Sequence, residues 1–261
     1  MFCWGEAHDG ALGLDVKEKC VMEARPNTAF GDKKIKCIAS SVSHTLILLE
    51  SGCLYSCGSN QYGQLGIEQK TSCIMIPAHI DTFDDTIIIS ISCGVKHSLA
   101  LSSDGSLYTW GDNSEGQLGL KTLQPICKPN ILSLPFGRPV VQAACGDHHT
   151  LALTQDGRVF SWGKNTTSQL GHSEGLSRVL APTQITHLIS TPVVKLICGS
   201  NHSAALTVSG GVFLWGDNRR AQCGFGRVTT KISYPTLNEF MERYTVSHVA
   251  CGTDHTVFQV Q

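Results

Sequence analysis

One histidine recurs along this chain at an almost constant interval. The positions are His44, His97, His149, His202 and His255, spaced 53, 52, 53 and 53 residues apart. A fixed period of this length is typical of repeat proteins, in which each repeat is one supersecondary unit that buries its core against its neighbours. The period therefore constrains the fold more strongly than the composition does.

Other residue types follow the same period. A tryptophan that precedes a glycine occurs at Trp4, Trp110, Trp162 and Trp215, with Cys57 in the second place. A later glycine, usually preceded by Gln-Leu, occurs at Gly13, Gly66, Gly119, Gly171 and Gly224. A proline occurs at Pro26, Pro77, Pro129, Pro182 and Pro235. These linked columns indicate five repeats of one unit, so we expect a single domain over residues 1–261.

Each repeat reads as four short strands. In one repeat, apolar or alternating runs predict strands at 140–145, 149–153 and 158–162, with a hairpin turn at 155–157. A fourth segment at 180–185 contains the repeated proline, which predicts an edge strand or a strand that starts there. Four antiparallel strands in about 53 residues is the size of a β-propeller blade. The fold class predicted is all-β.

The two ends of the chain fall at complementary places in the repeat. The chain begins on a third strand and ends on a second strand. We expect the N-terminal and C-terminal strands to pair and complete the terminal blade.

The repeated residues have structural explanations. The glycines suit turns with positive φ, the tryptophans suit the space between blades, and the histidines suit a hydrogen-bonded structural role. The cysteines at 93, 145, 198 and 251 occupy one column, and equivalent positions in successive repeats are normally too far apart for a disulfide. We expect them to be small buried groups in a reducing compartment.

Composition excludes several classes of partner. The net charge is −1, with no block of like charges, so nothing favours a specific nucleic acid. The N-terminus does not resemble a signal peptide, and no apolar run is long enough to cross a membrane. We expect a soluble cytoplasmic protein, with nuclear or ciliary association as an alternative.

The motif AACGDHHTLAL (143–153), followed by Trp162-Gly163 and Gln169-Leu170-Gly171, resembles the repeat of the regulator of chromosome condensation family. ISCGVKHSLAL (91–101) is similar to the same motif. The resemblance implies a propeller of four-stranded blades, usually seven. The family includes an exchange factor for the GTPase Ran, the retinitis pigmentosa GTPase regulator, a plant ultraviolet-B photoreceptor and HECT-type ubiquitin ligases. The N-terminus most resembles the propeller of the small HECT-type, HERC-like ligases.

The sequence departs from the family pattern at a few places. Ser40-Ser41 replace Cys-Gly in the first repeat, Cys57 replaces a tryptophan and Cys223 replaces the leucine of Gln-Leu-Gly. Single turns and contacts are affected by these changes, while the fold prediction is unchanged.

No enzyme chemistry is predicted. GHSEG (171–175) fits the nucleophile-elbow pattern, but a polar loop precedes it where a strand is required. The Cys-x-x-x-His spacing supplies only two ligands per repeat, and no Walker loop is present. We therefore expect no catalytic, cofactor or metal site.

Function is expected to lie in loops on the faces of the propeller. Two sets of loops vary from repeat to repeat. One is the residues after the Trp-Gly pair, and the other is the two residues between the glycine that precedes each repeated histidine (Gly94, Gly146, Gly199 and Gly252) and that histidine. The candidate interaction residues are Asp112, Asn113, Asp147, His148, Asp217, Asn218, Arg219 and Arg220. The favoured hypothesis is a non-catalytic protein-interaction scaffold in a ubiquitin-ligase-type or related assembly. The alternative is exchange or regulation of a small GTPase. Light sensing is disfavoured because every tryptophan lies on a repeat position.

Overall fold

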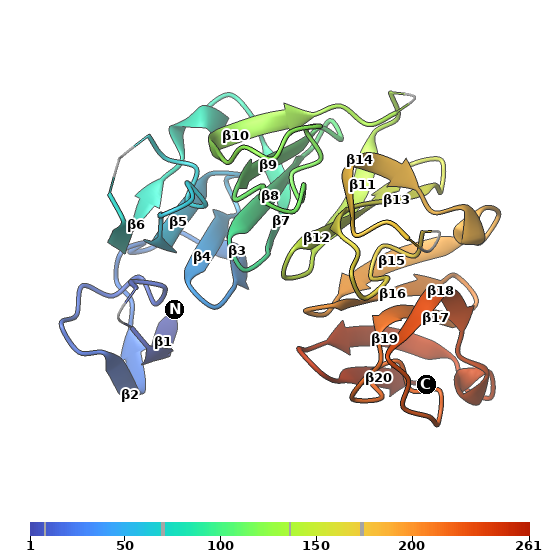
Figure 1. Cartoon of the computed structure of the whole chain (residues 1–261). Coiled ribbons are helices and arrows are strands. Elements are labelled where there is room, and N and C mark those ends of the chain that lie inside the picture. Colours follow the sequence, from blue (N-terminus) through green and yellow to red (C-terminus); the bar gives the residue numbers. More distant parts are fainter. Residues whose placement is uncertain (8, 69–70, 136, 173–174) are drawn as a thin grey trace. The chain divides into compact units, whose positions relative to one another are not determined.

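The computed structural model describes residues 1–7, 9–68, 71–135, 137–172 and 175–261. These residues form two compact units (Figure 1). Unit 1 comprises residues 1–113 and 124–132, and unit 2 comprises residues 114–123 and 133–261. A single domain over the whole chain stays a prediction.

Unit 1 contains a two-stranded sheet followed by two four-stranded sheets within its described residues. The first sheet is β1 (Phe2–Glu6) and β2 (Cys20–Pro26). The second is β3 (Ile35–Ser40), β4 (His44–Leu49), β5 (Leu54–Ser59) and β6 (Cys73–His79). After the 3-10 helix η1 (Asp81–Phe83), the third is β7 (Ile88–Cys93), β8 (His97–Ser102), β9 (Leu107–Gly111) and β10 (Ile126–Leu132).

Unit 2 repeats the pattern and ends with two strands within its described residues. Its first sheet is β11 (Val140–Cys145), β12 (His149–Thr154), β13 (Val159–Lys164) and β14 (Arg178–Gln184). After η2 (Thr186–Leu188), the second is β15 (Val193–Cys198), β16 (His202–Thr207), β17 (Val212–Asp217) and β18 (Lys231–Leu237). After η3 (Glu239–Met241) come β19 (Val246–Cys251) and β20 (Thr256–Val260).

The four-stranded sheets confirm the predicted blade. Each is antiparallel, with its strands paired in chain order. The strands of the repeat used for the prediction lie within two residues of the expected bounds. The repeated proline lies in the last strand, β6, β10, β14 or β18, at the edge of its sheet. An edge position suits proline, since the sheet needs no hydrogen bond from that side.

Within each unit, the core lies between successive blades. In unit 1, Leu46 and Leu48 of β4 pack with Ile88 and Ala100 of the next sheet. In unit 2, Leu151 and Leu153 of β12 pack with Leu196 and Ala205 of the next sheet. The second strands β4 and β16 are buried along their whole length because other parts of their own unit pack on both of their faces. Inter-blade packing therefore supplies the core that one blade lacks.

The terminal strands each belong to a two-stranded sheet. β1 pairs with β2, and β19 pairs with β20. Pairing of the N-terminal strand with the C-terminal strand stays a prediction.

Candidate functional site

A hydrogen-bond network that recurs in successive repeats holds the loop after the Trp-Gly or Cys-Gly pair against the following repeat. In unit 2, the backbone oxygen of Gln169 accepts from Trp215 Nε1 (2.9 Å) and from Ser203 Oγ (2.8 Å) of the following repeat. In unit 1, Gln64 O accepts from Trp110 Nε1 (2.9 Å) and Ser98 Oγ (2.7 Å) in the same way. The tryptophan column therefore does more than fill space, because each indole N–H ties its strand to the loop before it.

The repeated histidine also joins this network. The network determines which of its two ring nitrogens carries the hydrogen. His149 Nε2 lies 3.0 Å from Ser203 Oγ. Because that hydroxyl gives its only proton to Gln169 O, its oxygen accepts, and His149 Nε2 must carry the hydrogen. His149 Nδ1 is then an unprotonated nitrogen, buried with no hydrogen-bond partner in the structure. His202 repeats the arrangement, with Nε2 2.9 Å from Thr256 Oγ1.

Burial keeps these histidines neutral. It lowers the pKa of His149 to about 3, with the neighbouring His202 and His148 acting in the same direction. Burial also lowers the pKa of His44 to about 4. It lowers the pKa of His202 to about 4, although Asp217 and Asp254 act against the shift. In His149 and His202 a charged imidazolium would have no acceptor for its second proton, which fits a structural role.

A glycine lies against the rings of His149 and His202. A Cβ added at Gly146 would meet His149 Cε1 at 2.0 Å, and one at Gly199 would meet His202 Cε1 at 2.2 Å. These glycines are needed for close approach. In the first repeat, where Ser41 replaces the glycine, Ser41 Oγ lies 2.8 Å from His44 Nδ1. The departure noted in the sequence therefore supplies a partner for the nitrogen that has none in His149 and His202.

The other departures also keep the network. Ala11 occupies the position of the repeated glutamine, and its backbone oxygen accepts from Thr45 Oγ1 (2.8 Å). Cys57 Sγ contacts the same oxygen at 3.7 Å in place of an indole. Because the frame uses a backbone oxygen, the side chain at residue 11 is unconstrained by it. All twelve cysteines are free thiols in the structure.

Two columns deviate at the ends of the chain. Trp110, Trp162 and Trp215 are fully buried, but Trp4 is 61% exposed, and its role between blades stays a prediction. The reason is that Trp4 lies on β1, which has only β2 beside it in its sheet. His255 is likewise exposed, whereas His44, His97, His149 and His202 are buried.

The two predicted loop sets lie at one end of each blade. From Cys57-Gly58 onward, the residue after the Trp-Gly or Cys-Gly pair donates its backbone N–H to the backbone oxygen of the residue just before the repeated histidine. Examples are Ser59 N to Ser43 O (2.8 Å), Lys164 N to His148 O (2.9 Å) and Asp217 N to Asn201 O (2.9 Å). We call this end of the blades, within each unit, the loop face. The hairpin at 155–157 lies at the other end of β12.

Asparagine and glutamine shape each long loop from within. In the loop after Trp215, Asn218 Oδ1 accepts from Cys223 N (3.1 Å), while Gln222 Oε1 accepts from Arg220 N (2.9 Å). Asn165 and Gln169 make the same two bonds in the preceding loop. Asn113 and Asn218 are fully buried, so these two candidate interaction residues lie inside their loops and not on the surface. Their recurrence at the repeat period was the signal for that role.

The other candidates differ in accessibility. Asp112 and Asp217 are buried, Asp147 and His148 are half-buried, and Arg219 and Arg220 are exposed. Arg219 Nη2 lies 2.7 Å from Asp217 Oδ2. Burial opposes ionisation of Asp217, but the hydrogen bonds and charge of Arg219 outweigh it and lower the pKa of that carboxyl. Of the candidates, the structure joins Asp217 with Arg219, and Arg219 and Arg220 reach solvent.

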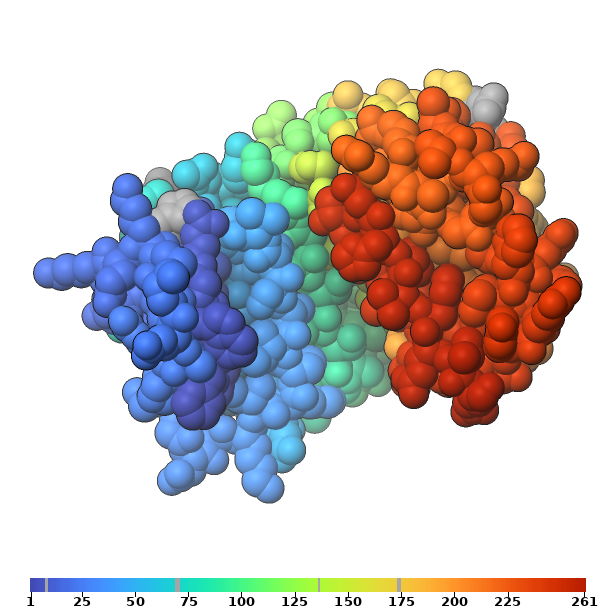
Figure 2. All heavy atoms as spheres, turned by 90° about the horizontal axis from the view of Figure 1, so that it is seen from below, coloured from blue at the N-terminus to red at the C-terminus, as the bar shows by residue number. Residues whose placement is uncertain are grey.

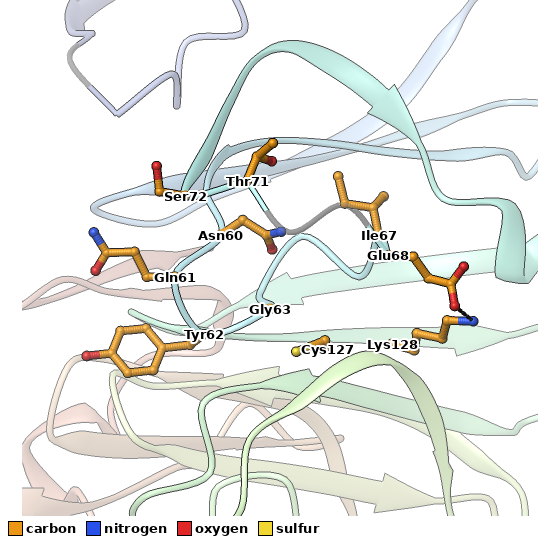
Figure 3. A pocket seen from close by; sticks show the side chains of 10 residues that line it. All are labelled: Asn60, Gln61, Tyr62, Gly63, Ile67, Glu68, Thr71, Ser72, Cys127 and Lys128. Atoms are coloured by element: carbon orange, nitrogen blue, oxygen red, sulfur yellow. Dashed lines mark ion pairs between the residues drawn. The ribbon is translucent and has the colours of Figure 1, made fainter.

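Unit 1 carries a hollow that the candidate residues did not include. It has a volume of about 950 Å³ and lies between the loop with Gln61 and Tyr62 and the β10 residues Cys127 and Lys128 (Figure 3). Lys128 forms an ion pair with Glu68 in its wall. Lys96 Nζ of the next repeat lies 3.1 Å from Tyr62 Oη and 4.4 Å from the ring centroid. Tyr62 and Lys96 thus link two loops, and no sequence pattern distinguishes them from other loop residues.

In the described residues, no group of three or more His, Cys, Asp or Glu side chains could hold a metal ion. Ser173 and Glu174 of the GHSEG match lie outside the described residues. His172 Nε2 lies 2.8 Å from the buried Ser161 Oγ of β13. Among the helices that the structure describes, none is long and apolar enough to cross a membrane.

Antiparallel four-stranded blades repeated at this period define the β-propeller class. The chain belongs to the RCC1-like domain family, whose model matches residues 1–258.

Relatives agree with this membership. The human Probable E3 ubiquitin-protein ligase HERC4 is 36% identical over 98% of this chain, which spans 29% of that protein. Ultraviolet-B receptor UVR8 of Arabidopsis thaliana is 31% identical over 90% of the chain and 53% of the receptor. The structure of Prp20p from Saccharomyces cerevisiae, described with its binding properties to Gsp1p and histones, matches with a TM-score of 0.85 and 26% identity. That match covers 99% of this chain and 64% of Prp20p. The chain thus spans less than a third of the length of HERC4.

Proposed function

We propose that this chain is a non-catalytic protein-interaction propeller that recognises a partner or substrate protein through its loop face, as part of a ubiquitin-ligase-type assembly. The single observation that carries the proposal is that the loop residues fall into two groups, one that holds the loop in shape and one that is accessible to a partner. Repeated Asn and Gln side chains hold each loop from within, while the two residues after each Asn differ from repeat to repeat and are exposed or half-buried. A rigid frame that presents variable side chains is how binding loops are commonly built.

The chemistry of the loop face favours a protein partner. The accessible residues are mixed: Arg219 and Arg220 in unit 2, and Tyr62 beside Lys96 in unit 1. Tyrosine and arginine are enriched where proteins bind proteins. The similarity to HERC4 over almost the whole chain supports a ubiquitin-pathway assembly, and a cytoplasmic location stays a prediction.

The test compares two variants with the same change in charge. The loop-face variant combines Asp147→Ala, Arg219→Ala and Arg220→Ala. The control combines Arg138→Ala, Glu242→Ala and Arg243→Ala, which are exposed residues away from the loop face. Proteins captured from cells by the natural chain should be lost with the loop-face variant and kept with the control. Equal capture by all three proteins would contradict the proposal.

The second candidate is exchange or regulation of a small GTPase. The likeness to Prp20p supports it, since that structure was described with binding to Gsp1p. Release of a fluorescent guanine nucleotide from a panel of small GTPases would test it. Accelerated release that the loop-face variant abolishes would establish this function, and unchanged release across the panel would exclude it for those GTPases.

A further inference from the structure

The loop between β17 and β18 carries a concentration of arginine. Its residues 218–230 contain Arg219, Arg220 and Arg227 and no acidic residue, whereas the corresponding loops of the other repeats contain no arginine. All three arginines are exposed, and the side chain of Arg219 is 64% accessible. In Figure 2, atoms of the C-terminal part of unit 2, in orange and red, lie at the surface of the molecule. This loop therefore presents three guanidinium groups to solvent.

Three buried side chains fix the backbone of the loop at these arginines. Asp217 Oδ1 accepts from the backbone N–H of the first arginine (3.0 Å), and Gln222 Oε1 accepts from that of the second (2.9 Å). Asn218 Nδ2 donates to the backbone oxygen of the third (3.0 Å). These three side chains belong to residues that are 4% exposed or less. Because the backbone is already ordered, a ligand that binds the arginines does not have to order it.

The first arginine is also oriented through its side chain. Arg219 Nε lies 3.0 Å from Asp217 Oδ1, and Arg219 Nη2 lies 2.7 Å from Asp217 Oδ2. The carboxylate thus occupies the Nε side of the planar guanidinium group. The Nη1 side faces away from that carboxylate, and its two N–H groups are suited to another anion.

The preceding loop shows that these positions are accessible when a complete blade follows. Asn165 Nδ2 donates to Leu176 O (2.9 Å), and Gln169 Oε1 accepts from Thr167 N (3.0 Å), so the same bonds hold this loop. Thr166 and Leu176 are exposed and Thr167 is half-buried, although the four-stranded sheet β15–β18 follows them. The two loops share one frame, and the later loop places arginine at all three of these positions.

Arginines grouped on a rigid loop are suited to a phosphate group. Guanidinium groups make paired, charge-assisted hydrogen bonds to phosphate, and arginine clusters are a common way to recognise phosphorylated segments. A phosphorylated serine or threonine has a charge near −2 and three acceptor oxygens, so one group can bond to several arginines. Nucleic acid would need a row of cations for its successive phosphates. The loop face of unit 2 instead places Asp147 and Asp254 on the neighbouring loops, which favours a single phosphate.

We propose that the loop at residues 218–230 binds a phosphorylated serine or threonine in the partner protein. Arg219, held by Asp217, and the neighbouring Arg220 and Arg227 donate to the phosphate oxygens. This inference rests on the proposed function, because it names the chemistry of the partner at one part of the loop face.

The test uses arrays of short peptides of random sequence in sets that differ only at the central residue. That residue is phosphoserine or phosphothreonine, the unmodified residue, or glutamate. Peptides that bind the natural chain should bind about tenfold more tightly when they are phosphorylated than in either of the other two forms, since only phosphate offers three oxygens to the arginines.

Two variants with the same change in charge show where the phosphate binds. Arg220→Ala/Arg227→Ala should abolish the preference for phosphorylated peptides, and it keeps the pair between Arg219 and buried Asp217 that orders the loop. The control, Arg138→Ala/Arg243→Ala, removes two exposed arginines away from the loop face and should keep the full preference.

Three results on these probes would overturn the inference. The first is equal binding of phosphorylated and unmodified peptides. The second is equal binding of the glutamate peptides, which would assign the loop to acidic segments in general. The third is tighter binding of a single-stranded oligonucleotide, or of vesicles that contain an anionic phospholipid, than of any phosphorylated peptide.

Phosphatase treatment of the cell extract separates this inference from the proposed function. Capture that depends on the loop face and is lost after phosphatase treatment supports both. Capture that is lost with the loop-face variant but survives phosphatase treatment leaves the proposed function standing and overturns this inference. Capture that the loop-face variant does not change contradicts the proposed function itself.

Discussion

Acid should unfold this protein through its buried histidines. Burial lowers the pKa of His44 and His202 to about 4 and of His149 to about 3, against about 6.5 in the unfolded chain. Between pH 6.5 and 4 the unfolded state therefore binds protons that the folded state does not. Stability falls as pH falls through this window, and is fully present above pH 6.5.

The magnitude follows from the shift. Each pH unit inside the window costs about 1.4 kcal/mol for each histidine, so at pH 5 each of the three lowers the free energy of unfolding by about 2 kcal/mol. A total of about 6 kcal/mol is comparable to the whole stability of an ordinary domain. Most ordinary carboxylates titrate near or below pH 4, so the range from pH 6.5 to 5 reports mainly on histidine.

Urea unfolding followed by tryptophan fluorescence at half-unit steps of pH is the assay. His149→Gln is the informative variant, because its amide can donate to Ser203 but does not titrate. We expect it to reduce the slope between pH 6.5 and 5 by about 1.4 kcal/mol per pH unit, whatever its effect on stability at pH 7. A stability that stays flat over this range, or a slope unchanged in His149→Gln, would refute the assignment of these histidines as buried and neutral.

Three substitutions test other parts of the frame by urea unfolding at pH 7. Gly146→Ala should lower the free energy of unfolding by more than about 2 kcal/mol, because its Cβ would overlap the His149 ring. Its control, Gly157→Ala, has no atom within 4 Å of its Cβ but a φ of +82°, and should cost about 1 kcal/mol. A smaller loss for Gly146→Ala than for its control would argue against the close approach. Trp162→Phe should cost about 2 kcal/mol through the lost indole hydrogen bond and lost packing, and a neutral effect would contradict that bond. Ser41→Gly should cost about 1 kcal/mol, since it removes the hydroxyl partner of His44; a gain in stability would show that the hydroxyl is not needed.

The period predicted the blade because every repeat must satisfy the same inter-blade contacts. Strand bounds at 140–145 and 149–153, and the edge position of the proline strand, follow from local patterning. The structural roles of the repeated residues were harder to predict from the sequence. The repeated glutamine acts through its backbone oxygen, which the identity of its side chain does not indicate. Ala11 can therefore take its place in the first repeat.

The candidate site was only partly predictable. Asn113 and Asn218 look like exposed loop residues in sequence, but their side chains close the loops from inside. Tyr62 and Lys96 lie 34 residues apart and meet only when successive repeats pack side by side. Exposure of Trp4 depends on what lies next to β1, which the period alone does not specify.

The measurement that tests the central claim most directly is hydrogen–deuterium exchange of the chain, free and bound to a partner captured through the loop-face experiment. Binding should slow exchange in the loops that contain residues 61–62, 147–148 and 219–220, and leave the outer strands β6, β10, β14 and β18 unchanged. Protection confined to those outer strands, with the loops unaffected, would contradict recognition through the loop face.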